Sequence, residues 1–208
     1  MERKSRIAVM FLGVVLCFGL IACSEKDFDA SAYVKSTLDA AFHQEYKAYA
    51  TFMDISEKEA KENQEQDFQE QIEQEFAGTD QITEEGIAEY VQMMSKVRDL
   101  AKYEVKDAKK DKDGNYTVKV KVEPSDIYQT LEQSATEVSK EKIDQGLKKD
   151  DPKVFASVLT ESIQKSIDRN TYGKAQTVEV EVKKDTSGAY VLDDTELDKL
   201  EAAMFPVK

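Results

Sequence analysis

Few residues in this sequence could carry chemistry, and they do not gather into one motif. The 208 residues include two cysteines, Cys17 and Cys23, and a single histidine, His43. One imidazole without a second histidine or a thiolate cannot build a typical transition-metal site. As a general base, His43 would need a nucleophile and an orienting group, which the sequence does not identify. We therefore expect a partly exposed helical histidine, and no catalytic residue, metal site or cofactor.

The acidic stretch Asp111-Lys112-Asp113-Gly114-Asn115 is a second candidate, because carboxylate and amide oxygens bind Ca²⁺. The EF-hand pattern places its glycine sixth in the loop, which makes Lys109 the first ligand and Val120 the last. Neither side chain can bind a cation, so the stretch predicts a hairpin turn. The adjacent acids Glu84-Glu85 and Asp193-Asp194 do not face each other on a helix, and helix capping explains them more simply.

The thiol of Cys23 stands at the end of a segment that is typical of an export signal. Residues 1–6 carry three basic side chains, residues 7–22 form an uncharged and largely apolar run, and the small Ala22 precedes the cysteine. This order of basic, apolar and small residues is that of a signal peptide. The apolar run is shorter than the roughly 20 residues that span a bilayer, which argues against a plain membrane-spanning helix.

Leu20-Ile21-Ala22-Cys23 resembles the lipobox of bacterial prolipoproteins. The resemblance implies that a diacylglyceryl group is attached to Cys23 and that residues 1–22 are removed as the signal peptide. Residues 23–29 would then be a short lipidated tether on the extracytoplasmic face of the cell membrane. Two acyl chains bind a membrane firmly, whereas one binds it only marginally. The alternatives are an ordinary secretory signal with an incidental Cys23, and a signal peptide that also yields a short signalling peptide from residues 14–22.

The chain is strongly acidic once the signal peptide is removed. Its formal net charge changes from −13 to −15, because the removed segment carries three basic residues and one acidic residue. Such a surface repels nucleic-acid phosphates and anionic lipid headgroups, so we expect no nucleic-acid partner and a covalent membrane anchor. With Cys17 removed and Cys23 acylated, no thiol remains for a disulfide or a thiolate site.

Helical periodicity covers most of the chain after residue 29. A first helix is expected over about 30–53, where apolar residues recur every three or four positions, namely Val34, Leu38, Phe42, Tyr46, Tyr49 and Met53. Ser56 and Glu59 fit a capping box at the start of a second helix. Further helices are expected over about 83–101, 127–138, 152–167 and 195–205. The fourth helix is expected to bend or end after Ser139, where its apolar phase slips.

The apolar period changes from 3.6 to 2 in two segments, 103–122 and 178–192. Each segment contains a glycine turn, so each predicts a β-hairpin with one buried face. A lone hairpin is marginally stable, so we expect both in one four-stranded antiparallel sheet with about five to six helices packed mainly on one face. Residues 30–208 are therefore expected to form a single α+β domain.

The two predicted hairpins share sequence. Lys109-Lys110-Asp111 aligns with Lys183-Lys184-Asp185, and the same offset matches Gly114 with Gly188 and Tyr116 with Tyr190. One interpretation is two related halves, each with helices followed by a hairpin. The other is that polar turns are alike in composition.

We expect the function of a lipid-anchored extracytoplasmic binding or interaction protein, because the chain carries an export signal and no recognisable catalytic motif. The mature part resembles small uncharacterised lipoproteins of Gram-positive bacteria, some with cone-shaped or cystatin-like α+β folds. That resemblance implies no activity. The alternative is an envelope enzyme of unrecognised type, which predicts a cleft where carboxylates or tyrosines converge.

Two forms of binding protein predict different structures. A ligand-binding cone predicts a closed pocket lined by residues such as Phe42, Tyr46 and Tyr49. A partner-binding module predicts that the only apolar row of the second helix, Phe68, Ile72 and Phe76, is exposed for docking. A solvated helix would instead bury that row on its own domain, which is the reading we favour.

Overall fold

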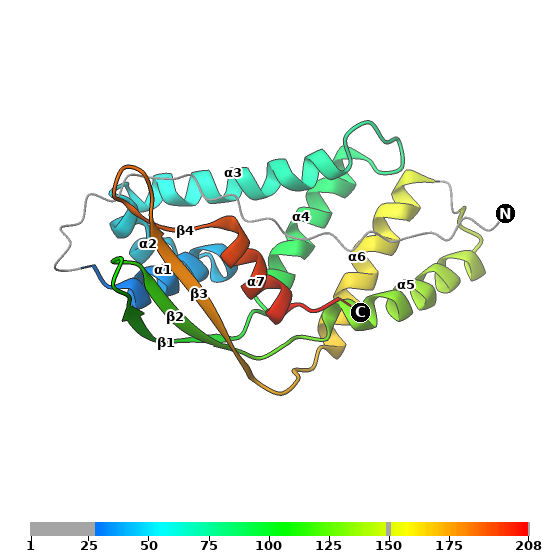
Figure 1. The fold of residues 1–208 in the computed structure, drawn as a ribbon. Coiled ribbons are helices and arrows are strands. Elements are labelled where there is room, and N and C mark those ends of the chain that lie inside the picture. Colours follow the sequence, from blue (N-terminus) through cyan, green and yellow to red (C-terminus); the bar gives the residue numbers. More distant parts are fainter. Residues whose placement is uncertain (1–27, 149–150, 208) are drawn as a thin grey trace.

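A computed structural model describes residues 28–148 and 151–207, so the predicted signal peptide and Cys23 lie outside the described part. In chain order the elements are α1 (Ala30–His43), α2 (Tyr46–Met53), α3 (Glu57–Glu75), α4 (Glu84–Arg98), β1 (Tyr103–Lys110), β2 (Tyr116–Val122), α5 (Ile127–Asp144), α6 (Pro152–Arg169), β3 (Gln176–Lys184), β4 (Tyr190–Leu192) and α7 (Asp194–Met204). The fold is elongated, with the sheet and α1 at one end and the tip of the α5–α6 hairpin at the other (Figure 1). The predicted α+β class is confirmed. Within the described ranges, no helix is both long and apolar enough to cross a bilayer.

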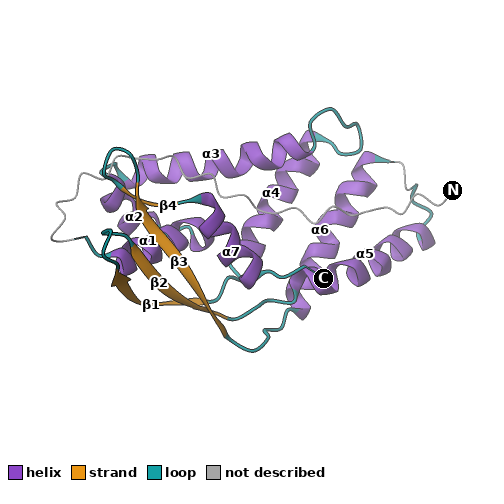
Figure 2. Ribbon diagram, viewed as in Figure 1, coloured by secondary structure: helices purple, strands orange, loops and turns teal. Residues whose placement is uncertain are grey.

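The sheet has the predicted two hairpins in the order β1-β2-β3-β4, and every neighbouring pair is antiparallel. Val118 lies opposite Val180 and Val120 lies opposite Val178, so the alternating valines of β2 and β3 share one face. Helices α1 and α7 pack on that face, and Val118, Val120 and Val180 are fully buried there (Figure 2). The other face is polar, with a cross-strand ion pair of 3.4 Å between Lys119 and Glu179.

Both edges of the sheet are protected against further pairing. The outer strand β1 shifts register between Val105 and Ala108, which is a bulge-like irregularity. The other outer strand, β4, has only three residues. Strand β4 pairs with β3 only over residues 182–184. The N–H of the preceding residue of β3, Glu181, is instead accepted by the carboxylate of Glu196 in α7 at 3.1 Å. Irregular, short and covered edges discourage strand addition.

The first predicted helix is in fact two helices, which corrects the continuous helix expected over 30–53. Gln44, between α1 and α2, has a left-handed backbone with φ of 57°. The apolar pattern runs across the break because both helices face the same core. The whole predicted stripe is buried, namely Val34, Leu38, Phe42, Tyr46, Tyr49 and Met53. This break raises the number of helices in the described residues to seven.

The buried guanidinium of Arg98 supports the end of α1. It donates a hydrogen bond to the carbonyl of Ala41 and lies 4.2 Å from the centre of the Phe68 ring in α3. The last carbonyls of a helix lack intrahelical donors, so Arg98 supplies one of them where the chain turns into α2. Burial lowers the pKa of Arg98, and the nearby Tyr46 and Glu201 oppose that shift.

Helix α3 packs its apolar row against the core of the fold. Ser56 Oγ accepts the N–H of Glu59 at 3.1 Å, which confirms the predicted N-cap. Phe68 and Ile72 are buried and Phe76 is half-buried. The row is therefore not an exposed docking surface. This confirms the interpretation of a solvated helix that buries its apolar row.

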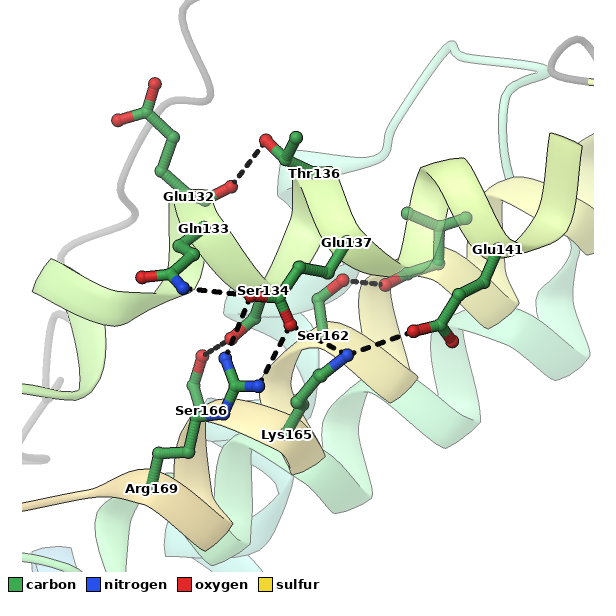
Figure 3. A network of polar contacts seen from close by, with 11 residues as sticks. Glu132, Gln133, Ser134, Thr136, Glu137, Glu141, Ser162, Lys165, Ser166 and Arg169 are labelled. Atoms are coloured by element: carbon green, nitrogen blue, oxygen red, sulfur yellow. Dashed lines mark hydrogen bonds and ion pairs between the residues drawn. The ribbon is translucent and has the colours of Figure 1, made fainter. Parts of the chain in front are cut away.

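Helices α5 and α6 form a hairpin inserted between β2 and β3. The insertion is closed at its base by Asp126, whose carboxylate accepts the N–H of Thr171 at 2.8 Å. Ser166 and Ser134 join the helices through a buried hydrogen bond of 2.9 Å, beside a network of ion pairs (Figure 3). Helix α5 runs without interruption to Asp144, so it does not end after Ser139, one of the two outcomes expected there. Since α5 packs mainly on α6, its exposed end needs no continuous apolar stripe.

Candidate functional site

A groove of about 310 Å³ lies where the end of α1 meets the start of β1. Its walls come from the end of α1, from the start of β1 with the two residues before it, and from the end of β2 with the residue after it. The lining residues are His43, Ala101, Lys102, Tyr103, Glu104, Lys121 and Glu123. Because β1 is an outer strand, the groove lies at the edge of the sheet.

His43 is held against the groove by aromatic stacking. Its ring centre lies 5.3 Å from that of Tyr103, with 25° between the planes. The Tyr103 hydroxyl donates to Asp39 Oδ1 at 2.9 Å, and the same carboxylate is paired with Lys35. His43 is half-buried and is the last residue of α1, which confirms the predicted partly exposed helical histidine.

The hydroxyl of Tyr103 is suited to positioning rather than to acid-base chemistry. Burial, and then the negative charge of Asp39, raise the pKa of this phenol above its ordinary value. A phenol with a raised pKa keeps its proton near neutral pH and remains a hydrogen-bond donor to the carboxylate. The link from Tyr103 to Asp39 therefore fixes β1 to α1 beside the groove.

The outer rim of the groove carries both signs of charge. Glu104 lies opposite Lys121 on the paired strands β1 and β2. It also forms an ion pair with Lys106, and this lysine lowers the pKa of the Glu104 carboxyl. The ammonium of Lys102 lies 3.5 Å from the centre of the Tyr172 ring. Such a rim can bind a polar ligand with complementary charges, and it contains no serine, threonine or cysteine that could act as a nucleophile.

The other candidate residues from the sequence have structural roles in turns and helix caps. The stretch around Gly114 is the predicted hairpin turn: Asp111 Oδ1 accepts the N–H groups of Asp113 and Asn115, each at 2.9 Å. Asp193 caps α7 by accepting the N–H of Glu196 at 3.0 Å, which is the capping role expected of the adjacent acids. Across 28–148 and 151–207, no three histidine, cysteine, aspartate or glutamate side chains come together as a metal-binding group.

The residues proposed for a closed ligand pocket occupy the core instead. Phe42, Tyr46 and Tyr49 are each less than 7% exposed, and none of them lines the groove. Sequence reasoning missed the groove, because the predicted strands carry no signal for which helix end lies beside them. The one available signal was His43, a polar ring directly after the buried Phe42.

Comparison with known proteins defines the fold and leaves the family open. No protein-family model matches the chain, and no curated protein sequence matches it. The structure resembles a crystal structure of a candidate lipoprotein, ycdA, from Bacillus subtilis subsp. subtilis str. 168, with a TM-score of 0.60 and 14% sequence identity. The likeness covers 86% of this chain and 57% of that protein, so this chain spans little more than half of its length. At this identity the likeness concerns the fold alone.

Proposed function

We propose that this protein is an extracytoplasmic lipoprotein, held at the cell membrane by lipid on Cys23, and that its folded part acts by binding. The observation that carries the proposal is the order of residues 1–23: a basic start, an apolar run and Leu20-Ile21-Ala22-Cys23. The shared fold with ycdA, which is described as a candidate lipoprotein, supports the same kind of protein.

The first described residue is close in sequence to the proposed anchor. Phe28, the first described residue, is only 7% exposed and belongs to the hydrophobic core. Phe28 follows Cys23 by five positions, which is at most about 18 Å of extended chain. Lipid on Cys23 would therefore hold the fold close to the bilayer surface.

Binding suits the groove better than catalysis does. Several of its side chains are already held by neighbours: His43 stacks on Tyr103 within the groove, while Glu104 pairs with Lys106 and Lys102 lies on Tyr172 just outside it. Such pre-positioned side chains can recognise a polar ligand at little cost in conformational entropy.

The anchor is tested by substituting each cysteine separately. We expect Cys23→Ala to abolish incorporation of labelled palmitate and to release the protein from the membrane fraction or leave it unprocessed. Cys17→Ala is the matched control, because Cys17 lies in the same N-terminal segment and would leave with the signal peptide. Palmitate labelling that survives Cys23→Ala would refute the anchor.

The groove is tested with a photo-crosslinking amino acid in place of Lys121, introduced into the full chain in its native membrane. We expect a specific adduct from this position and none from the same amino acid at Lys140, an exposed residue of α5. Addition of Lys121→Glu protein without the probe should fail to compete, whereas wild type should compete. Equal adducts at both positions would show that the groove is not the binding surface.

A further inference from the structure

Both hairpin turns lie at the end of the molecule where the described chain begins (Figure 1). The ring of Phe28 stacks on Tyr190, with centres 4.1 Å apart, and lies 5.6 Å from the ring of Tyr116. Tyr116 is the first residue of β2 and Tyr190 is the first residue of β4, so each follows a turn directly. The first described residue therefore lies beside the two turns.

The two turns have the same architecture. Asp111 Oδ1 accepts two backbone N–H groups in the first turn, and Asp185 Oδ1 accepts those of Ser187 and Ala189 in the second, at 2.8 and 3.0 Å. Gly114 and Gly188 occupy the same left-handed conformation, with φ of 91° and 88°. The carboxylates of Asp111 and Asp185 are thus used inside the turns.

The turns carry several lysines, whose positive charge is opposite in sign to the net charge of the molecule. We call Lys109, Lys110, Lys112, Lys183 and Lys184 the lysine end. Lys109, Lys110, Lys112 and Lys183 are exposed. Within the described ranges, Lys109, Lys110 and Lys112 make no ion pair with an acidic side chain, in a protein of net charge −13.

The ammonium groups of two of these lysines lie over the rings of the tyrosines that follow the turns. The Lys110 ammonium lies 5.4 Å from the centre of the Tyr116 ring, and the Lys184 ammonium lies 5.3 Å from that of Tyr190. The side-chain amide of Asn115 also accepts the N–H of Lys184 at 3.2 Å, which joins the first turn to β3. The lysine end is therefore a pre-formed surface.

We propose that the lysine end faces the membrane and contacts anionic phospholipid headgroups, so that it orients the anchored protein. The inference rests on the proposed lipid anchor at Cys23. The chain between Cys23 and Phe28 spans at most about 18 Å when fully extended, so an anchored Cys23 would keep Phe28 within that distance of the lipid. Lysines near an anionic surface are attracted to it, whereas the acidic remainder of the protein is repelled. Asp111, Asp113 and Asp185 of the same turns offset part of the attraction, and Lys183 is paired with Glu181 at 2.7 Å, so the contact orients the protein and does not replace the anchor. The groove beside His43 would then lie further along the sheet, toward the opposite ends of the strands.

The orientation is tested by acetylation footprinting of lysines. The chain from Cys23 to Lys208, in which Cys23 is the only thiol, is coupled through that thiol to a maleimide lipid in vesicles. We expect Lys109, Lys110 and Lys112 to react about threefold or more slowly on vesicles containing phosphatidylglycerol than on pure phosphatidylcholine, and this difference should disappear at high salt. Lys140, near the other end of the molecule, should react equally on both. Equal rates at the lysine end on the two kinds of vesicle would overturn the proposal.

Charge-matched variants separate the lysine end from charge in general. In the Lys109→Gln, Lys110→Gln, Lys112→Gln variant, the protection of Lys183 on anionic vesicles should be lost. The control Lys140→Gln, Lys148→Gln, Lys153→Gln removes the same charge from exposed positions on the α5–α6 hairpin and should keep it. Protection of Lys183 that survives the first variant would also overturn the proposal. Because the lipid is attached chemically, this result is independent of whether cells acylate Cys23, which the palmitate experiment decides.

Discussion

Phe28 stacks face to face on Tyr190, with ring centres 4.1 Å apart and 14° between the ring planes. This contact joins the first described residue to the last hairpin of the chain. Tyr33, Phe52 and Tyr116 surround the same ring at 5.6 to 6.3 Å. The first described residue is thus held by an aromatic cluster drawn from α1, α2, β2 and β4.

Phe28→Ala should lower the free energy of unfolding by about 3–5 kcal/mol, because it empties the centre of this cluster. The measurement is urea unfolding of the mature chain with Cys23 replaced by serine. Leu147→Ala is the control: Leu147 is 43% exposed, so its loss should change stability by less than about 0.5 kcal/mol. A similar small effect at both sites would show that Phe28 is not part of the folded core.

The sheet was predictable because its signal is local. The alternation of Val118, Val120 and Val122 with lysine and threonine assigns one face to the core, and glycine marks the turn. The break between α1 and α2 was not predictable, because Gln44 is a common helix former and the apolar period continues through it. Only the tertiary packing, including the Arg98 contact to the Ala41 carbonyl, favours ending the helix there.

Gln44→Gly should stabilise the protein by about 0.5 kcal/mol. A residue with a Cβ atom costs about 1–2 kcal/mol in the left-handed region, and the greater freedom of glycine in the unfolded chain offsets part of that gain. Gln44→Ala is the matched control, since it removes the same exposed side chain and keeps the Cβ atom. Chemical unfolding should rank glycine above glutamine and alanine. If alanine stabilises as much as glycine does, the backbone conformation at this position is not the cause.

The groove could not be predicted from the sequence, and the physical reason differs from that for the helix break. Its walls depend on which helix end lies beside β1, and this is decided by contacts such as Tyr103 with Asp39 rather than by any local pattern. Lipid attachment at Cys23, in contrast, is predicted from four consecutive residues, because export machinery reads sequence before folding. Cys23 lies outside the described part, so its acylation stays a prediction for the palmitate experiment.

The contribution of Glu137 to stability should depend on pH. Its carboxylate binds Arg169 at 2.9 Å and Lys165 at 2.8 Å (Figure 3), and these contacts, that of Arg169 first, lower its pKa from about 4.5 to about 2. The folded state therefore holds the proton less tightly than the unfolded state. The resulting stabilisation is complete above about pH 4.5 and is lost as the pH falls toward 2.

This pH dependence is checked by measuring the free energy of unfolding of wild type and of Glu137→Gln across the same pH range. Wild type should be the more stable protein at pH 7, and the difference should shrink steadily as the pH falls through the range between these two pKa values. Glu132→Gln is the control on the same helix, because the Glu132 side chain makes no ion pair with another described residue. A difference at Glu137 that is constant with pH would mean that the ion pairs do not contribute.

The close crossing of α4 and α6 predicts a coupling between Gly86 and Ala156. A Cβ atom on Gly86 would lie 2.6 Å from Ala156 Cβ and 2.9 Å from Ile82 Cγ1, well inside contact distance. Gly86→Ala would gain about 1 kcal/mol of helix propensity, yet overpacking of this kind costs about 1–3 kcal/mol, so we expect a net loss of stability. Ala156→Gly removes the nearest obstacle. The double variant should therefore be more stable than the sum of the single variants predicts, by about 0.5–1 kcal/mol, with the contact to Ile82 limiting the recovery. Strict additivity in this cycle would mean that the helices separate freely at the crossing, and that the α5–α6 hairpin is not held against α4 by close packing at this glycine.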